Sequence, residues 1–146
     1  MRAVNWAIVV LVSGGCAVSG EQIPPQGTPF VQVYTGNGDF GGFQETTIYE
    51  GDILVTSSVE EGGRKRQSAV VQAPLGRFAA VSALVAAEGS AVIAQATRPE
   101  DRCLDYGEDA VTAQPPAGTF GRVYALCPEP AIQAFTDSVR DAMTAP

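Results

Sequence analysis

The stretch TTIYEGDILVTS, residues 46–57, decides the fold, because it places two segments of strand composition on either side of a tight turn. Thr, Ile, Tyr and Val favour strands, and the sequence Glu50–Asp52 between the segments is typical of a turn. A strand, a short turn and a second strand form an antiparallel hairpin. The stretch therefore predicts a domain built on an antiparallel sheet.

Further segments of the same kind lie on both sides of this hairpin. Residues 30–34 precede it and residues 67–72 follow it. Residues 109–113 and 120–126 form a second predicted hairpin across a turn that contains two prolines and a glycine. We therefore expect an antiparallel sheet of about four to six strands.

Two amphipathic helices are predicted, one after each group of strands. The first follows Pro74 and ends at Gly89, and residues 91–96 fit either an extension of it or another strand. Its apolar face is expected to carry Leu75, Phe78, Val81, Leu84 and Val85. The second helix begins at Pro130, and its apolar face is expected to carry Ile132, Phe135, Val139 and Met143. The predicted fold class is α+β, one sheet packed by two helices.

Residues 1–19 have the order of a secretory signal peptide. A cation at Arg2 is followed by an apolar run over residues 6–12 and then by small residues. The apolar run is much shorter than the roughly twenty residues that span a bilayer. The segment is therefore expected to be an export signal and not an anchoring helix.

Two cleavage sites remain open in this signal. Cleavage before Cys16, which follows Gly14 and Gly15, resembles the processing of a bacterial lipoprotein, in which the cysteine becomes the lipidated first residue. Cleavage before Gly20 would instead release a soluble periplasmic protein. We favour lipidation of Cys16, although Ser13 stands where lipoproteins usually carry an aliphatic residue.

The lipoprotein interpretation also predicts where the protein lies. In the Gram-negative lipoproteins that this signal resembles, a residue other than Asp after the cysteine favours the outer membrane, and here Ala17 follows Cys16. The protein would then face the periplasm on a lipid anchor. Residues 17–28 are polar and rich in Pro and Gly, which predicts a flexible tether, and residues 29–146 form a single domain.

Charge composition limits the partners of the chain. The sequence has 9 Lys and Arg residues against 16 Asp and Glu residues, a net charge of −7 at pH 7. Removal of the signal takes away Arg2 and no acidic residue, so the mature chain is more acidic still. Strong negative charge repels nucleic acid and anionic lipid surfaces. We therefore expect a protein partner in the envelope and no nucleic acid.

Cysteine content agrees with export. Besides Cys16, the sequence has Cys103 and Cys127, an even pair that an oxidising compartment joins in a disulfide. Their spacing is not the Cys-x-x-Cys of thiol-redox proteins. We predict a structural disulfide that ties the approach to the second hairpin to the start of the second helix.

Catalytic chemistry is limited by the absence of histidine from the sequence. Ser-His-Asp and Cys-His catalysis and histidine-ligated zinc are excluded. No catalytic residue, metal site or cofactor is predicted. An enzymatic alternative is a carboxylate-dependent cell-wall hydrolase. It would use the acidic residues Glu100, Asp101, Asp105, Glu108 and Asp109, whose spacing matches no calcium loop.

A glycine-rich segment, Gly36–Phe43, is the candidate partner-binding loop. It contains a Gly-x-Gly-x-x-Gly pattern but leaves no room for the helix that a dinucleotide site requires before the next strand. It is therefore expected to be a hairpin loop, whose candidate contact residues are Asn37, Asp39, Phe40 and Phe43. The two aromatic residues either contact a partner or fold back onto the sheet. The basic residues 64–66 either contact phosphates or protect a turn or sheet edge.

The run GNGDFGGFQETTIYEGDILV, residues 36–55, and the later LGRFAAVSALVA, residues 75–86, resemble emfourin-type proteins. These are small bacterial inhibitors of thermolysin-like metalloproteases, with a Gly-Gly-Phe loop before a strand, a turn and a helix. The resemblance implies that inhibition would depend on residues 40–43. The secretion signal and the cysteine pair depart from that family.

The function expected from the sequence is that of a non-catalytic envelope lipoprotein acting as a structural or interaction module. The first alternative is a periplasmic protease inhibitor that uses the segment Gly36–Phe43. The second alternative is the carboxylate-dependent hydrolase.

Overall fold

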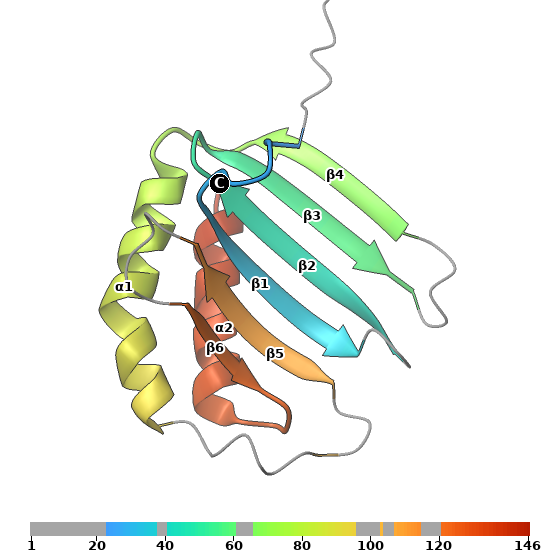
Figure 1. Ribbon diagram of the computed structural model, residues 1–146, viewed down its shortest axis with the longest axis vertical. Coiled ribbons are helices and arrows are strands. Elements are labelled where there is room, and N and C mark those ends of the chain that lie inside the picture. The colour runs from blue at the N-terminus through green and yellow to red at the C-terminus, as the bar shows by residue number, and fades with distance from the viewer. Residues whose placement is uncertain (1–22, 38–40, 61–65, 96–102, 104–106, 115–120) are drawn as a thin grey trace, which may run out of the picture.

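The computed structural model describes residues 23–37, 41–60, 66–95, 103, 107–114 and 121–146. The sheet has six antiparallel strands in the order β4-β3-β2-β1-β5-β6, with two helices on one of its faces (Figure 1). The predicted α+β class is confirmed. The strands are β1 (Phe30–Asn37), β2 (Gly42–Tyr49), β3 (Ile53–Val59), β4 (Arg66–Gln72), β5 (Glu108–Ala113) and β6 (Arg122–Ala125). The helices are α1 (Arg77–Gln95) and α2 (Pro130–Thr144).

The strand register separates the two faces of the sheet. Val31 on β1 pairs with Ile48 on β2 and Ala113 on β5, and these side chains point toward the helices. Directly opposed residues of antiparallel strands share a face, and successive residues alternate between faces. Phe30, Tyr34 and their cross-strand partners therefore lie on the face away from the helices, here called the open face.

The hydrophobic core lies between the helices and the middle of the sheet. α2 packs on β5, β1 and β6, α1 packs on β1 and β6, and the two helices contact each other. The apolar side of α2 is buried as predicted, with Ile132, Phe135, Val139 and Met143 all in the core. Together with Val31, Val33, Ile48 and Val111 they form one continuous cluster.

The first helix differs from its prediction at both ends. It runs through the buried Gly89 to Gln95, because a single glycine costs only about 1 kcal/mol in a helix and alanine-rich sequence follows it. Val81 and Val85 are fully buried, as expected. Leu75 is not on the apolar face, since it precedes the helix, and Gly76, with φ +82°, turns the chain between them.

The glycine-rich segment Gly36–Phe43 is strand at both of its ends. β1 continues to Asn37 and β2 begins at Gly42, so the pairs Gly36–Phe43 and Asn37–Gly42 extend the hairpin ladder. Gly36 has φ +129°, and a Cβ there would meet the backbone of Gly42 at 2.5 Å. Asn37, Gly42 and Phe43, which were expected in the loop, therefore belong to the sheet.

The disulfide predicted between Cys103 and Cys127 is present, with a Cα–Cα distance of 4.9 Å. The backbone N–H of Cys103 also donates to the carbonyl of Leu126 at 3.3 Å. The bond therefore holds the connection into β5 against the connection from β6 to α2, as expected.

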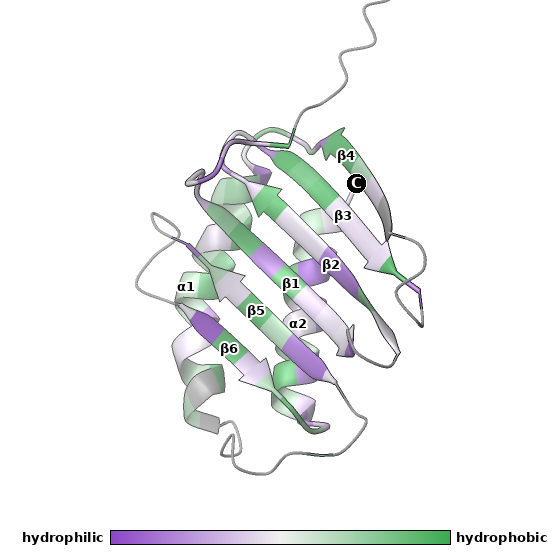
Figure 2. Cartoon of the chain, turned by 45° about the vertical axis from the view of Figure 1, so that its right-hand side comes forward, coloured by the Kyte–Doolittle hydropathy of each residue, from purple (hydrophilic) through white to green (hydrophobic). Residues whose placement is uncertain are grey.

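The domain has two distinct ends. The tether end contains residues 23–29, the β2–β3 turn, the β4–α1 connection and the C-terminus, and the distal end contains the β1–β2 hairpin tip and the start of α2 (Figure 1). Hydrophobic residues of β2 and β3 lie mostly toward the tether end (Figure 2). Neither described helix is long and apolar enough to cross a membrane.

Candidate functional site

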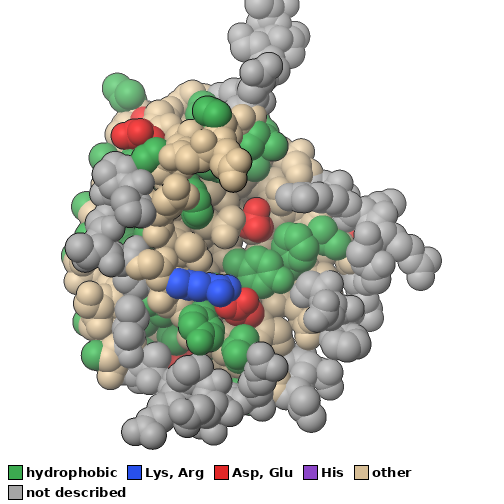
Figure 3. All heavy atoms as spheres, viewed as in Figure 1, with side chains coloured by type: hydrophobic (Ala, Val, Ile, Leu, Met, Phe, Trp, Pro, Cys, Tyr) green, Lys and Arg blue, Asp and Glu red, His purple; other side chains and the backbone are tan. Residues whose placement is uncertain are grey.

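No described helix or strand covers the open face (Figure 1). Its side chains come from alternate positions of all six strands, so backbone pairing fixes their spacing. Figure 3 shows hydrophobic side chains on this face beside a basic and an acidic side chain. The candidate site, here called the aromatic-ionic patch, consists of Tyr34, Phe43, Glu108, Arg122 and Tyr124.

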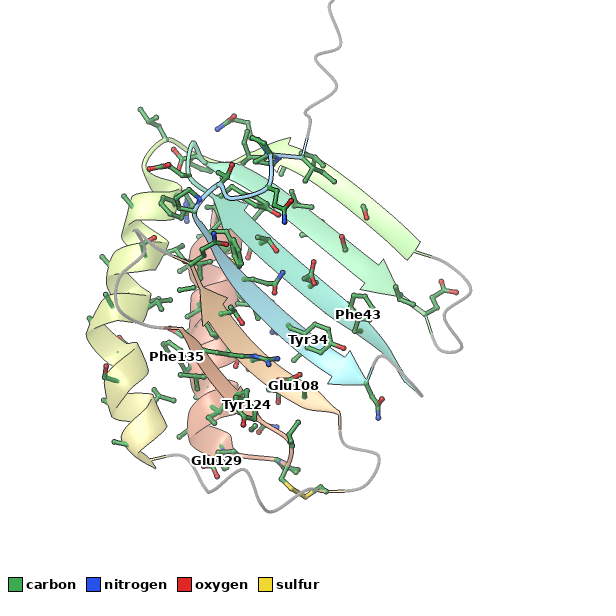
Figure 4. All side chains as sticks on the ribbon, viewed as in Figure 1. Tyr34, Phe43, Glu108, Tyr124, Glu129 and Phe135 are labelled. Carbon is green, nitrogen blue, oxygen red and sulfur yellow. A yellow bond between two sulfur atoms is a disulfide. The ribbon has the colours of Figure 1, made fainter. Side chains whose placement is uncertain are left out.

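Tyr34 and Phe43 form the hydrophobic part of this patch. Their rings are stacked, with centroids 5.3 Å apart and planes inclined by 28°. They lie side by side on β1 and β2, near the distal end (Figure 4). Offset stacking of this kind contributes about 0.5 to 1.5 kcal/mol beyond area burial. The pair therefore forms a rigid apolar platform on the sheet.

Arg122, Glu108 and Tyr124 form the ionic part. Arg122 Nη2 donates to Glu108 Oε1 across the β5–β6 pair, and the guanidinium lies 5.2 Å from the centre of the Tyr124 ring. Glu108 and Tyr124 lie on the β5 and β6 side of Tyr34, opposite Phe43 (Figure 4). Because the ion pair is partly exposed, its contribution to stability is small. The guanidinium between the Glu108 carboxylate and the Tyr124 ring forms a charged border beside the aromatic stack.

The opposite end of the open face has a matching aromatic pair. Phe30 and Tyr49 lie at the tether end of β1 and β2, with centroids 6.0 Å apart. Burial raises the pKa of the Tyr49 phenol above its ordinary value of 10.0, and the nearby Glu45 carboxylate adds to the rise. Between the two pairs, Gln32 Nε2 donates to Thr47 Oγ1 at 3.2 Å.

A hollow lies on the helix side of the sheet, near the distal end. It has a volume of about 420 Å³ and is lined by Thr35, Asp109, Gln133, Thr136 and Asp137. Arg140 on α2 closes one side by donating to Thr35 Oγ1 at 2.6 Å and to Asp137 Oδ1 at 2.7 Å. The polar groups of this hollow therefore hold α2 against β1.

The acidic residues considered for hydrolysis do not converge on one site. Glu108 and Asp109 are consecutive on β5, so their side chains point to opposite faces of the sheet. Glu108 pairs with Arg122, whereas Asp109 is buried on the helix side. Glu100, Asp101 and Asp105 lie outside the described residues. Over the part of the chain that the structure describes, no group of three Cys, Asp or Glu side chains is arranged to hold a metal ion.

The sequence-predicted site residues are only partly described. Asn37 ends β1 and Phe43 lies on β2 in the aromatic-ionic patch, whereas Asp39 and Phe40 lie outside the described residues. Cys16, the signal peptide, and Arg64 and Lys65 also lie outside them.

Three residues of the patch were not predicted from the sequence. Each lies in a predicted strand: Tyr34 in the first, and Arg122 and Tyr124 in the last. Because alternate residues of a strand share a face of the sheet, their positions could have been used to predict which face they occupy. The missing information was the pairing of β1 with β5, which the sequence order conceals.

The sequence matches no protein-family model, no curated protein and no solved structure at a significant level. The site is therefore interpreted from its own geometry.

Proposed function

We propose that this chain is a non-catalytic envelope lipoprotein, anchored through Cys16, whose aromatic-ionic patch binds a protein partner. The observation that supports this proposal best is the stacked pair Tyr34–Phe43 on a sheet face that no described element covers. Rigid aromatic side chains are frequent anchors of protein interfaces, because they bury a large area at little entropic cost.

The arrangement around the stack favours a protein over a small ligand. The patch is carried by the sheet surface, with an apolar centre at Tyr34 and Phe43 and a charged border at Glu108 and Arg122. An apolar centre with a polar border is the usual organisation of protein interfaces. Small-molecule sites are concave and enclose their ligand.

The chemistry of the patch favours binding over catalysis. Its carboxylate is paired with Arg122, and its remaining polar groups are phenols. A carboxylate-dependent hydrolase needs a second carboxyl group facing the same substrate. The nearest acid in sequence, Asp109, points to the opposite face.

The experiment that tests this function compares Tyr34→Ala and Phe43→Ala with the control Phe30→Ala. Phe30 belongs to an aromatic pair on the same face but at the opposite end. Partners are captured in envelopes by photocrosslinking from a benzoylphenylalanine at Glu45, a half-buried residue that lies on the same face as Phe43 and opposite Tyr34. We expect at least about tenfold less crosslinked partner with the first two variants, as for interface hot spots, and wild-type crosslinking with Phe30→Ala.

Equal crosslinking by all three variants would reject the patch as the binding site. The alternative of a protease inhibitor uses the same hairpin, and Phe43 beside the hairpin tip is the observation that favours it. If the captured partner is a metalloprotease whose activity falls on binding, and Phe43→Ala relieves that inhibition, the inhibitor function replaces the general interaction function.

A further inference from the structure

The largest departure from the expected core is Leu75. Its side chain is 99% exposed, although the sequence pattern placed it on the apolar side of α1. It lies in the connection between β4 and α1, at the tether end of the domain (Figure 1). A fully exposed leucine loses the free energy that burial would supply, so its position calls for an explanation.

The turn that presents Leu75 is held firmly. The backbone N–H groups of Gly76 and Phe78 donate to the two carboxylate oxygens of Asp52, each at 2.7 Å. The N–H of Arg77 also donates to the carbonyl of Pro74 at 3.1 Å. Asp52 is itself only 5% exposed. The exposure of Leu75 is therefore fixed by hydrogen bonds on both sides of it.

A second exposed apolar side chain lies at the same end. Ile23 is 60% exposed and is the first described residue, within the tether. The chain joins the domain six residues later, where the N–H of Glu50 donates to the carbonyl of Pro29 at 2.9 Å, after a turn in which the N–H of Thr28 donates to the carbonyl of Pro25 at 3.2 Å. Seven residue steps separate Cys16 from Ile23, which limits their distance to about 25 Å. A lipid on Cys16 would hold this end close to the bilayer.

The charges of this end fit contact with a neutral lipid surface. The guanidinium of Arg77 is occupied, since Nη1 donates to the carbonyl of Ala142 at 2.8 Å and Nη2 to that of Pro146 at 3.4 Å. Glu50 is exposed in the β2–β3 turn and would be repelled by anionic headgroups. Attraction to the bilayer would therefore come from apolar insertion and not from basic residues.

We propose that the tether end rests on the lipid surface that holds the anchor, with Leu75 and Ile23 inserted at its interface. This inference rests on the lipid anchoring in the proposed function. Insertion of one leucine changes partitioning by on the order of tenfold, too little for stable attachment alone but enough to orient a tethered domain. The distal end of the domain, with the aromatic-ionic patch near it, is then farthest from the bilayer and is exposed to the periplasm.

The experiment uses tryptophan as a depth probe in the full chain. Trp6 is the only tryptophan in the sequence, so Trp6→Phe gives a background without one. Leu75→Trp and the control Gln44→Trp each add one indole at an exposed position, at the tether end and near the distal end respectively. Each chain is purified from membranes, its intact mass is measured, and it is reconstituted in vesicles of the net-neutral lipids phosphatidylethanolamine and phosphatidylcholine with brominated acyl chains.

We expect the emission of Leu75→Trp to shift to shorter wavelength and to be quenched by brominated lipid, whereas Gln44→Trp emission stays unchanged. The same indole is used at both positions, so a difference reports position and not the affinity of indole for lipid.

The outcomes separate this inference from the proposed function. An acylated chain in which neither indole is quenched, or both are quenched equally, overturns the orientation and leaves the anchored interaction protein standing. A chain without acyl groups overturns both. If the wild-type chain captures no partner in envelopes, the partner-binding function is overturned, and the orientation on the bilayer is left intact.

Discussion

Tyr49 illustrates how the open face changes the properties of a single residue. Its ring packs against Phe30, with centroids 6.0 Å apart, and its strand neighbour Ile53 lies opposite on β3. Burial first and the Glu45 carboxylate second raise the pKa of the Tyr49 phenol above 10.0. The folded protein therefore favours the neutral, protonated form of the Tyr49 phenol.

This residue makes stability depend on pH in alkaline solution. Below about pH 10 the phenol is neutral in both states. Above that pH the unfolded chain ionises first, so the free energy of unfolding falls by up to about 1.4 kcal/mol per pH unit until the folded-state pKa is passed. Urea unfolding between pH 8 and 11 measures this loss. Tyr49→Phe should reduce the slope, and Tyr124→Phe, at a more exposed position on β6, is the control. Identical slopes in wild type and Tyr49→Phe would refute the prediction.

At the scale of elements, the β2–β3 turn organises the start of α1. Asp52 has φ 64°, an uncommon conformation for a residue other than glycine, and its carboxylate accepts the N–H groups of Gly76 and Phe78. These N–H groups lie at the beginning of α1, where a helix leaves its donors without partners. A turn between two strands thereby caps a helix that begins 25 residues later.

We expect Asp52→Ala to lower the free energy of unfolding by about 2 to 3 kcal/mol, because it removes a helix cap and forces alanine into a positive φ. Asp52→Gly separates the two effects, since glycine accepts the backbone conformation but cannot cap. Asp52→Asn should lose the least, because asparagine tolerates this conformation and keeps one acceptor oxygen. Thermal and urea unfolding check the order, and a loss by Asp52→Asn equal to that of Asp52→Ala would contradict it.

Three elements, α1, α2 and β2, show how much of the secondary structure could be predicted from the sequence alone. α2 was predicted from Pro130 with its four buried apolar residues, because a period of 3.6 residues on a helix is visible locally. Leu75 was assigned wrongly to α1, since the start of a helix depends on tertiary contacts such as the Asp52 cap, whereas the extension past Gly89, left open from the sequence, is present to Gln95. Phe43 was placed in a loop because glycines surround it, whereas ladder pairing with Gly36 draws it into β2.

At the scale of the whole molecule, the disulfide limits the freedom of the connection between the two sheet-and-helix units. Cys103 and Cys127 are 24 residues apart and enclose β5 and β6. The bond joins the segment before β5 to the segment before α2, both near the distal end. Closing this loop reduces the entropy of the unfolded chain.

Replacing both cysteines by alanine should lower the free energy of unfolding by roughly 3 to 4 kcal/mol in the chain-entropy model. Urea unfolding of the double variant measures the loss, and the wild-type protein with its disulfide reduced should show nearly the same value. Because the sheet pairs are unaffected, the folded double variant should keep the far-ultraviolet circular dichroism of the wild type. Stability equal to the oxidised wild type would show that the bond does not constrain the unfolded state.

The sequence by itself determined the α+β class, the succession of strands and helices, the buried side of α2 and the pairing of the two cysteines in a disulfide. These features depend on local periodicity, turn composition and an even cysteine count. The tertiary structure decided that β5 lies against β1, which brings Glu108 and Arg122 near Tyr34 on one face. It also decided that Leu75 is exposed beside the tether. Both depend on contacts between residues far apart in the chain, and no local pattern encodes such contacts.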